Sequence, residues 1–194
     1  MSRIIAVQVE KCLACKSCEL ECAIAHSAAR ELYGANQESP QPRARVTVVA
    51  AGAATVPLQC RQCEDAPCVA VCPSRALRKP DPDSPVVTQP ELCIGCKSCV
   101  LVCPFGVIAV GPGGKAIIKC DLCLERLERG QEPACVAACP THALSLREVE
   151  EIAAEHRRTA AREMATALLY NQGALQAGLG ATEDDGNGER EPRG

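Results

Sequence analysis

Sixteen cysteines dominate the chemistry open to this sequence, and they stand in four groups of four. The gaps within the groups are x2-x2-x3, x2-x4-x3, x2-x2-x3 and x2-x11-x3, so every group ends on an interval of three residues. The groups are Cys12, Cys15, Cys18 and Cys22; Cys60, Cys63, Cys68 and Cys72; Cys93, Cys96, Cys99 and Cys103; and Cys120, Cys123, Cys135 and Cys139. A 4Fe–4S cluster is held by four cysteine thiolates. The four groups therefore predict four 4Fe–4S clusters.

The third group, followed by Pro104, is the bacterial ferredoxin signature without alteration. Its two-residue gaps let one loop bring three sulfurs to three irons, while the fourth cysteine ligates the other cluster in two-cluster ferredoxins. The first group departs from the signature because Ala23 stands in place of proline. The second and fourth groups are looser, and the fourth taken alone also fits a zinc site. Four groups of four favour clusters throughout, with zinc at the fourth group as the alternative.

An internal repeat relates the two halves of the chain. Glu10–Cys18 matches Glu91–Cys99, and Cys68–Pro73 matches Cys135–Pro140. The order of motifs is thus A-B-A-B, as if a unit of two motifs had been duplicated.

The elements that position these cysteines are predicted to be short. Arg45–Val49 is rich in valine and reads as a strand. Residues 106–110 and 116–118 flank Gly111-Pro112-Gly113-Gly114 and read as a hairpin. The final x3 intervals predict single helical turns that end near Cys72, Cys103 and Cys139, each stopped by the proline that follows.

A longer helix is predicted from Leu146 to about Tyr170. Ser145 and Glu148 form a capping-box pattern at its start. Its apolar stripe is expected to pack on the protein's own body, with docking to a subunit as the alternative. Residues 171–194 are rich in Gly, Glu, Asp and Arg, so we expect a disordered tail.

The composition bounds the class of protein. One Phe, two Tyr and no Trp leave little bulk for a core, so the chain needs something else to fold around. The sequence suggests no signal peptide, twin-arginine leader or apolar run of the ~20 residues that span a bilayer. We therefore expect a cytoplasmic protein, in which patterned cysteines are more often metal ligands than disulfides. The formal charge of −3 counts the thiols as neutral. The negative charge of the ligating thiolates exceeds the positive charge of the cluster cores, so the loaded protein is more negative still. This argues against nucleic acid as a partner, which usually requires a basic surface.

Residues 3 to about 147 resemble the four-cluster ferredoxin-type electron-transfer subunits of anaerobic oxidoreductases. Lys119–Arg126 and Glu132–Thr141 are very similar to the fourth motif of those subunits. Lys11–Ser27 looks closest to the iron–sulfur protein associated with carbon monoxide dehydrogenase. The resemblance implies electron transfer from carbon monoxide dehydrogenase to an acceptor such as hydrogenase. The alternative is the β subunit of a molybdopterin oxidoreductase such as formate dehydrogenase or formate hydrogenlyase.

The resemblance also implies a fold and a pairing of groups. The fold class is α+β, with two bacterial-ferredoxin-like dicluster modules and a C-terminal helix. The outer module comprises 1–59, with an insertion, and 104–145; the inner module is 60–103; the helix is 146–170 and the tail 171–194. Each pair of groups exchanges its fourth cysteine, although the spacing alone also allows sequential pairing. The implied ligand sets are Cys12, Cys15, Cys18 and Cys139 (cluster 1); Cys60, Cys63, Cys68 and Cys103 (cluster 2); Cys93, Cys96, Cys99 and Cys72 (cluster 3); and Cys120, Cys123, Cys135 and Cys22 (cluster 4).

No catalytic residues are predicted. The three histidines, His26, His142 and His156, are interpreted as packing or surface residues, because cysteine already fills all sixteen ligand places. Lys16 and Lys97 flank ligands and either offset thiolate charge or are simply solvated. The chain shows no Gly-rich nucleotide loop, so we expect an electron-transfer component rather than an enzyme. The rival classes are an iron–sulfur protein with a labile catalytic or regulatory cluster and a structural zinc protein.

Overall fold

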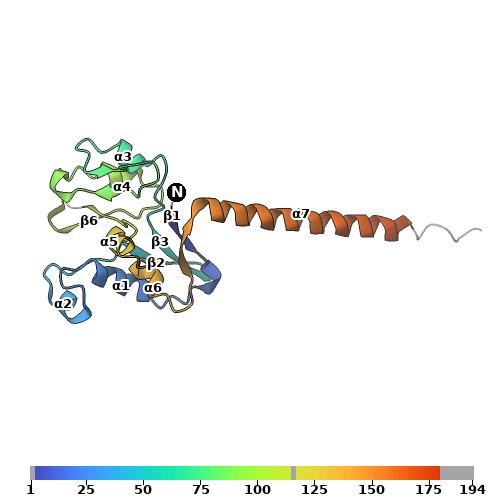
Figure 1. Cartoon of the computed structure of the whole chain (residues 1–194), viewed down its shortest axis with the longest axis horizontal. Helices are drawn as coiled ribbons and strands as arrows, with labels where there is room; N and C mark the ends of the chain where they lie inside the picture. The colour runs from blue at the N-terminus through green and yellow to red at the C-terminus, as the bar shows by residue number, and fades with distance from the viewer. Residues whose placement is uncertain (1–2, 115–116, 180–194) are drawn as a thin grey trace, which may run out of the picture. The chain divides into compact units, whose positions relative to one another are not determined.

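The computed structural model describes residues 3–114 and 117–179. The chain divides into two compact units (Figure 1). The first ends at Val149 and contains every cysteine, and the second begins at Glu150. The first unit mixes short strands and short helices, which confirms the predicted α+β class.

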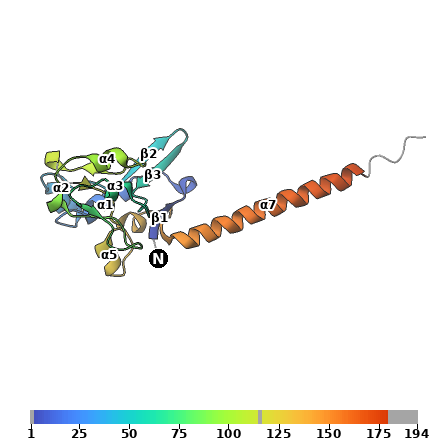
Figure 2. The same ribbon diagram turned by 90° about the horizontal axis from the view of Figure 1, so that it is seen from above.

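Four two-stranded antiparallel ribbons form the β structure of the described residues. They pair β1 (Arg3–Val7) with β8 (Leu144–Glu148), β2 (Val46–Ala51) with β3 (Ala54–Gln59), β4 (Leu77–Arg78) with β5 (Val87–Thr88), and β6 (Ala109–Val110) with β7 (Ile117–Ile118). Figure 2 shows β2 and β3 as the long hairpin. An isolated two-stranded ribbon is at best marginally stable, so each ribbon depends on what packs against it.

The β1–β8 ribbon corrects the predicted start of the C-terminal helix. Leu146 pairs with Ile5 in this ribbon, and the helix α7 runs over Val149–Leu179. Pairing with β1 satisfies the backbone of the strand, which outweighs the local capping-box pattern of Ser145 and Glu148. The predicted disordered tail is also wrong for residues 171–179, which continue α7; residues 180–194 lie outside the described residues.

The helix α7 makes up the described part of the second unit. Arg157 and Glu150 form an ion pair of 2.7 Å on it, and Met164 and Leu168 are exposed. In the described stretches of the chain, no helix combines the length and apolarity needed to cross a membrane.

The predicted helical turns are present where the x3 intervals stand. The described helices of the first unit are α1 (Ser17–Ala25), α2 (Leu32–Gln37), α3 (Pro67–Ala70), α4 (Ser98–Val102), α5 (Leu124–Glu128) and α6 (Ala134–Ala137), with 3-10 turns η1 (Val9–Lys11), η2 (Pro90–Leu92) and η3 (Pro112–Gly114). The helix α1 is longer than its counterpart α4, because Ala23 lets it continue past Cys22 whereas Pro104 follows Cys103. The extra turn ends at His26 and brings that ring beside the fourth cysteine group.

The strand predictions hold with small shifts. The predicted strand 45–49 is β2, and the predicted hairpin is the β6–β7 pair, with Ala116 outside the described residues. The partner of β2 was not predicted. Gly52, at a φ of 62°, makes the turn that lets β3 fold back on β2.

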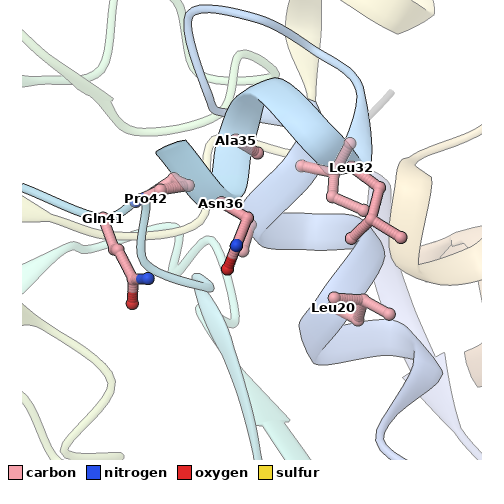
Figure 3. Close-up of a pocket in the computed structure, with 8 residues that line it drawn as sticks. Leu20, Leu32, Ala35, Asn36, Gln41 and Pro42 are labelled. Carbon is pink, nitrogen blue, oxygen red and sulfur yellow. The ribbon is translucent and has the colours of Figure 1, made fainter. Parts of the chain in front are cut away.

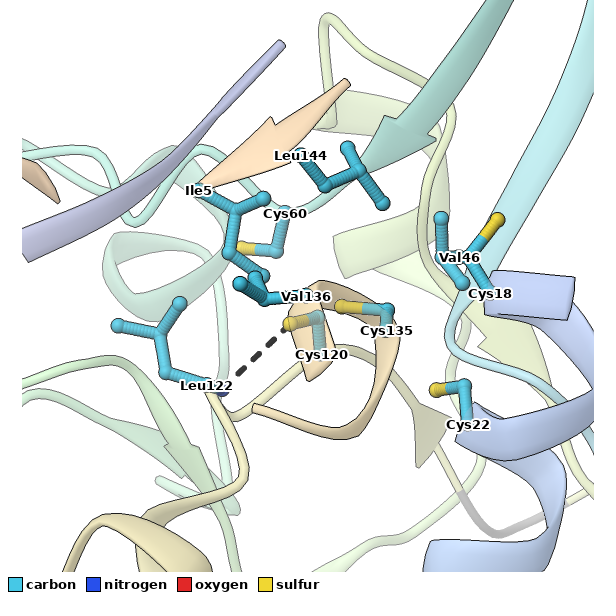
Figure 4. Packing of buried hydrophobic residues seen from close by; sticks show 10 residues of the cluster. All are labelled: Ile5, Cys18, Cys22, Val46, Cys60, Cys120, Leu122, Cys135, Val136 and Leu144. Atoms are coloured by element: carbon cyan, nitrogen blue, oxygen red, sulfur yellow. Dashed lines mark hydrogen bonds between the residues drawn. The ribbon is translucent and has the colours of Figure 1, made fainter. Parts of the chain in front are cut away.

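Two buried clusters of hydrophobic side chains and cysteines form the core of the first unit. The first contains Ile5, Cys18, Cys22, Val46, Cys60, Cys120, Leu122, Cys135, Val136 and Leu144 (Figure 4). The second contains Cys68, Leu77, Val86, Cys99, Ile108 and Ile117. Seven of these sixteen residues are cysteines, so cysteine side chains supply a large part of this core.

Candidate metal centres

The sixteen cysteines are all free thiols, and we group them into four candidate sites. We call these sites 1 to 4, numbered as the predicted clusters. Site 1 is a pocket lined by Cys12, Cys15, Cys18 and Cys139. Site 2 is a pocket lined by Cys60, Cys63, Cys68 and Cys103. Three cysteines of one group thus share each pocket with the last cysteine of another.

Sites 3 and 4 are identified by cysteines whose charge affects the pKa of cysteines from another group. At site 3, the charge of Cys72 acts on Cys96 and Cys99. At site 4, the charge of Cys22 acts on both Cys120 and Cys135. At each of these sites, the last cysteine of one group thus lies near two cysteines of another.

The loops of the repeat take the same unusual backbone conformation at equivalent positions. Ala14 and Gly95, and likewise Lys16 and Lys97, have φ values between 56° and 73°. Left-handed residues reverse the chain over a short distance, so the flanking cysteines can point to one side of the loop. This is the geometry that a loop wrapped around one metal cluster requires.

Sites 1 and 3 reach the surface. Cys15 and Cys96 are exposed, whereas no cysteine of site 2 or site 4 is. Hydrogen bonds from Ser17 lower the pKa of Cys15, and hydrogen bonds from Ser98 lower the pKa of Cys96. These donors stabilise a thiolate before any metal is considered.

Cys72 at site 3 and Cys139 at site 1, the last cysteines of the two B motifs, have similar surroundings. Burial alone would raise the pKa of Cys72 and of Cys139, but hydrogen bonds from the backbone at Leu77 and Leu144 and from nearby hydroxyls lower it. Ala143 N–H lies 3.2 Å from the Cys139 sulfur. Such N–H···S contacts are the kind that tune an iron–sulfur cluster.

Site 4 is the most enclosed, with all four of its cysteines buried. Burial raises the pKa of Cys120 to about 12 and raises the pKa of Cys135 far above its ordinary value. At site 2, burial likewise raises the pKa of Cys68 to about 11. Buried thiols ionise only when a cation offsets the charge, so these donor sets suit bound iron rather than free thiolates. The dashed line in Figure 4 marks the Leu122 N–H, which lies 3.4 Å from the Cys120 sulfur.

A charged network borders site 4. His26 Nδ1 donates to the carbonyl of Cys22 over 2.7 Å, and His26 Nε2 lies 3.3 Å from Asp121 Oδ1. Arg45 pairs with the other carboxylate oxygen of Asp121, and its backbone N–H donates to the Cys22 sulfur over 3.2 Å. Burial alone would lower the pKa of His26, but hydrogen bonds with Asp121, Cys123 and Cys22 raise it to about 12. The imidazole is therefore a cation that donates from both nitrogens.

Asp121 completes this network. Burial alone would raise the pKa of its carboxyl, but the hydrogen bond from His26 and the charge of Arg45 hold it well below its ordinary value. The ligand atoms of His26, Asp121 and Cys123 lie within 4.8 Å of one another, as the ligands of a metal ion would. The imidazole nitrogens and the carboxylate oxygens already have protein partners, so we interpret the group as a charge network.

A pocket outside the cysteine sites lies between α1 and α2 (Figure 3). Its volume is about 150 Å³, and it is lined by Leu20, Ala23, Ile24, Leu32, Ala35, Asn36, Gln41 and Pro42. None of these side chains titrates, and small-molecule sites usually exceed ~300 Å³. The pocket therefore offers no acid, base or nucleophile.

The predicted accessory residues lie in different settings. His142 is exposed with a φ of 52°, and His156 is exposed on α7. Lys16 and Lys97 are exposed residues that precede α1 and α4. The structure thus brings only His26 of the three histidines into a site. The cysteine spacing predicts no role for the side chains of Asp121, Arg45 and Lys119, although Lys119 and Asp121 flank Cys120 in the sequence.

Comparison with known proteins points the same way as the site. The family model described as "4Fe-4S dicluster domain" matches residues 52–149. An iron–sulfur protein of Rhodospirillum rubrum is 41% identical over 84% of this chain and 90% of its own length. The electron transport protein HydN of Escherichia coli is 42% identical over 88% of this chain and 100% of its own length. The B subunit of the anaerobic dimethyl sulfoxide reductase of Escherichia coli is 32% identical over 80% of this chain and 78% of its own length.

Proposed function

Because the chain belongs to the 4Fe–4S dicluster family of electron-transfer proteins, we propose that its sixteen cysteines hold four 4Fe–4S clusters in one electron-transfer path. A bound cluster supplies the redox chemistry: it takes up and releases electrons at a potential that hydrogen bonds, charge and solvent exposure adjust. The protein's own residues hold, insulate and expose the four sites.

The ligand sets of this proposal follow the exchanged pattern. Cys139 completes site 1, Cys103 site 2, Cys72 site 3 and Cys22 site 4. The observation that supports it most strongly is that Cys139 and Cys103 each share a pocket with three cysteines of another group, at sites 1 and 2. At sites 3 and 4, Cys72 and Cys22 each lie close enough to two cysteines of another group to affect their pKa values. The modules that this pairing defines are the outer one, 1–59 with 104–145, and the inner one, 60–103.

In the path we propose, the four sites are ordered 1–4–2–3. Cysteines of sites 1, 4 and 2 share the first core cluster, represented by Cys18, Cys135 and Cys60. Cysteines of sites 2 and 3 share the second core cluster, represented by Cys68 and Cys99. The order 1–4–2–3 places the two sites with exposed cysteines at the ends. Such an order lets one partner dock at each end while the middle remains insulated.

The proposed donor is carbon monoxide dehydrogenase and the proposed acceptor a hydrogenase, both in the cytoplasm. The resemblance of Lys11–Ser27 to the protein associated with that dehydrogenase supports this choice. The second candidate is service to a molybdopterin oxidoreductase, which the similarity to the B subunit of dimethyl sulfoxide reductase favours. Neither proposal includes nucleic acid, because the formal charge of −3 offers no basic footprint.

The test is to mix the oxidised protein anaerobically with carbon monoxide dehydrogenase reduced by carbon monoxide, and to follow the bleaching of its visible absorption. We expect rapid reduction that slows as the ionic strength rises, because a negative protein is steered to a positive docking patch. Formate with a formate-oxidising molybdenum enzyme is the matched alternative donor. Reduction by that enzyme, with none by carbon monoxide dehydrogenase, would transfer the assignment to the second candidate.

A further inference from the structure

Lys119 is a buried lysine that joins two parts of the core. Its side chain is 2% exposed, and Nζ donates to the carbonyl of Val86 over 2.5 Å and to the carbonyl of Cys120 over 2.7 Å. Val86 belongs to the core cluster that contains cysteines of sites 2 and 3, whereas Cys120 is a cysteine of site 4. The ammonium therefore lies where the middle two sites adjoin.

A neutral side chain bridges the same two residues through a different atom of Val86. Gln62 is 3% exposed; its Nε2 donates to the carbonyl of Cys120 over 3.0 Å, and its Oε1 accepts from the N–H of Val86 over 2.9 Å. Hydrogen bonding between Val86 and Cys120 thus does not require a lysine. What Lys119 adds at this place is a hydrogen bond to the Val86 carbonyl and a positive charge.

The described partners of the Lys119 ammonium are two carbonyl oxygens rather than a carboxylate. The ion pairs found within residues 3–114 and 117–179 do not include Lys119. Burying a cation without a counter-charge is costly. The cation acts on two of the proposed ligands. Burial raises the pKa of Cys68 at site 2 and of Cys120 at site 4, and the charge of Lys119 lowers both.

The internal repeat supplies a natural comparison. Gln59 precedes Cys60 as Lys119 precedes Cys120, and both side chains are buried. Gln59 Nε2 donates to the carbonyl of Ile5 over 3.0 Å, and its Oε1 has no hydrogen-bond partner among residues 3–114 and 117–179. The same fold therefore accepts a neutral glutamine at this position of the motif.

We propose that Lys119 tunes the middle of the path: its fixed positive charge raises the reduction potentials of the clusters at sites 2 and 4. The inference rests on the proposed function, since it requires clusters at both sites. Reduction brings one electron to a site from an added chemical reductant, and no bond forms or breaks. A nearby cation stabilises the more negative, reduced form. An electron that enters at site 1 or site 3 is then more stable at sites 2 and 4, because their reduction potentials are higher.

The experiment compares Lys119→Met and Lys119→Gln with Gln62→Met in the full-length, cluster-loaded protein. Both Lys119 variants remove the charge, and Gln62→Met removes only the neutral bridge. Potentials are measured by redox titration with electron paramagnetic resonance, after iron has been counted in every variant. We expect each Lys119 variant to make two of the four clusters about tenfold harder to reduce, a fall of about 59 mV for one electron. Gln62→Met should change the reduction equilibria by less than about twofold.

Two results would overturn the inference: unchanged potentials in a Lys119 variant that keeps four clusters, or equal shifts in Lys119→Met and Gln62→Met. If both Lys119 variants lose iron, Gln59→Lys decides, because a lysine beside Cys60 should raise a potential at site 2. Failure of that rise, or loss of iron there too, would assign Lys119 a structural role only. Wild-type protein without four clusters would instead refute the proposed function.

Discussion

Sites 1 and 3 differ from sites 2 and 4 in their environment, although all four are built from the same ligand. Cys15 and Cys96 are exposed and hydrogen bonds lower their pKa values, whereas burial raises the pKa values of Cys68 and Cys120. The first kind of site suits exchange of electrons with another protein, and the second suits retention away from water. The difference follows the type of motif: Cys15 and Cys96 belong to the two A motifs, whereas Cys68 and Cys120 belong to the two B motifs.

The two B-motif sites also differ from each other. Site 4 is bordered by His26, Asp121 and Arg45, and all of its cysteines are buried. At site 2, Cys63 and Cys103 are half-buried. One substitution explains part of this contrast: Ala23 in place of proline extends α1 to His26.

The largest expected effect comes from removing the metal altogether. Because cysteines make up much of both core clusters, chelating the iron anaerobically should abolish the cooperative thermal transition of the first unit. Circular dichroism before and after chelation measures this, and reconstitution with iron and sulfide is the control. An apoprotein with a native spectrum and a cooperative melt would refute the dependence of the core on its clusters.

The next prediction tests the exchange between motifs. Cys22→Ser should remove or convert the cluster of Cys120, Cys123 and Cys135, at a cost of up to about four iron atoms. Cys15→Ser is the matched control, because it should disturb only the exposed site 1. Mössbauer and electron paramagnetic resonance spectra distinguish the two. If Cys22→Ser altered only the cluster of Cys12, Cys15 and Cys18, the pairing would be wrong.

The charge network beside site 4 should contribute a smaller, pH-dependent stability. Asp121→Asn removes the ion pairs to Arg45 and His26 and should lower the free energy of unfolding by about 1–3 kcal/mol near neutral pH. The folded carboxyl has a lowered pKa, so its contribution is complete above the ordinary value of about 3.9 and is lost as the pH falls below it. Denaturant titrations of both proteins from about pH 7 downward measure the difference. A constant difference into acid would show that the carboxylate charge is not responsible.

The smallest effect should appear in the order of cluster loss. Under limiting anaerobic chelator with an alkylating agent, Cys15 and Cys96 should be labelled severalfold sooner than Cys120 and Cys135, because only the former are exposed. Peptide mass spectrometry over time measures the order. Simultaneous labelling of all four cysteines would mean that the exposed and buried sites open together.

Much of this arrangement could be predicted from the sequence, because cysteine spacing and proline stops act locally. The helical turns before Cys72 and Cys139 are of this kind. The β8 strand could not be predicted, since Leu146 is held by pairing with Ile5 at the far end of the chain. The roles of Asp121 and Lys119 were missed for the same reason, because their partners Arg45 and Val86 are distant in sequence.

The metal content of the protein distinguishes four 4Fe–4S clusters from three clusters and a zinc ion. Protein purified without oxygen should hold about sixteen iron and sixteen acid-labile sulfide per chain, from four clusters with four irons each. Iron, sulfide and zinc are measured on the same sample, with protein quantified by amino-acid analysis. Sixteen of each, with negligible zinc, is the result that four 4Fe–4S clusters require. Stoichiometric zinc with about twelve iron would contradict it and would return the fourth cysteine group to a zinc site.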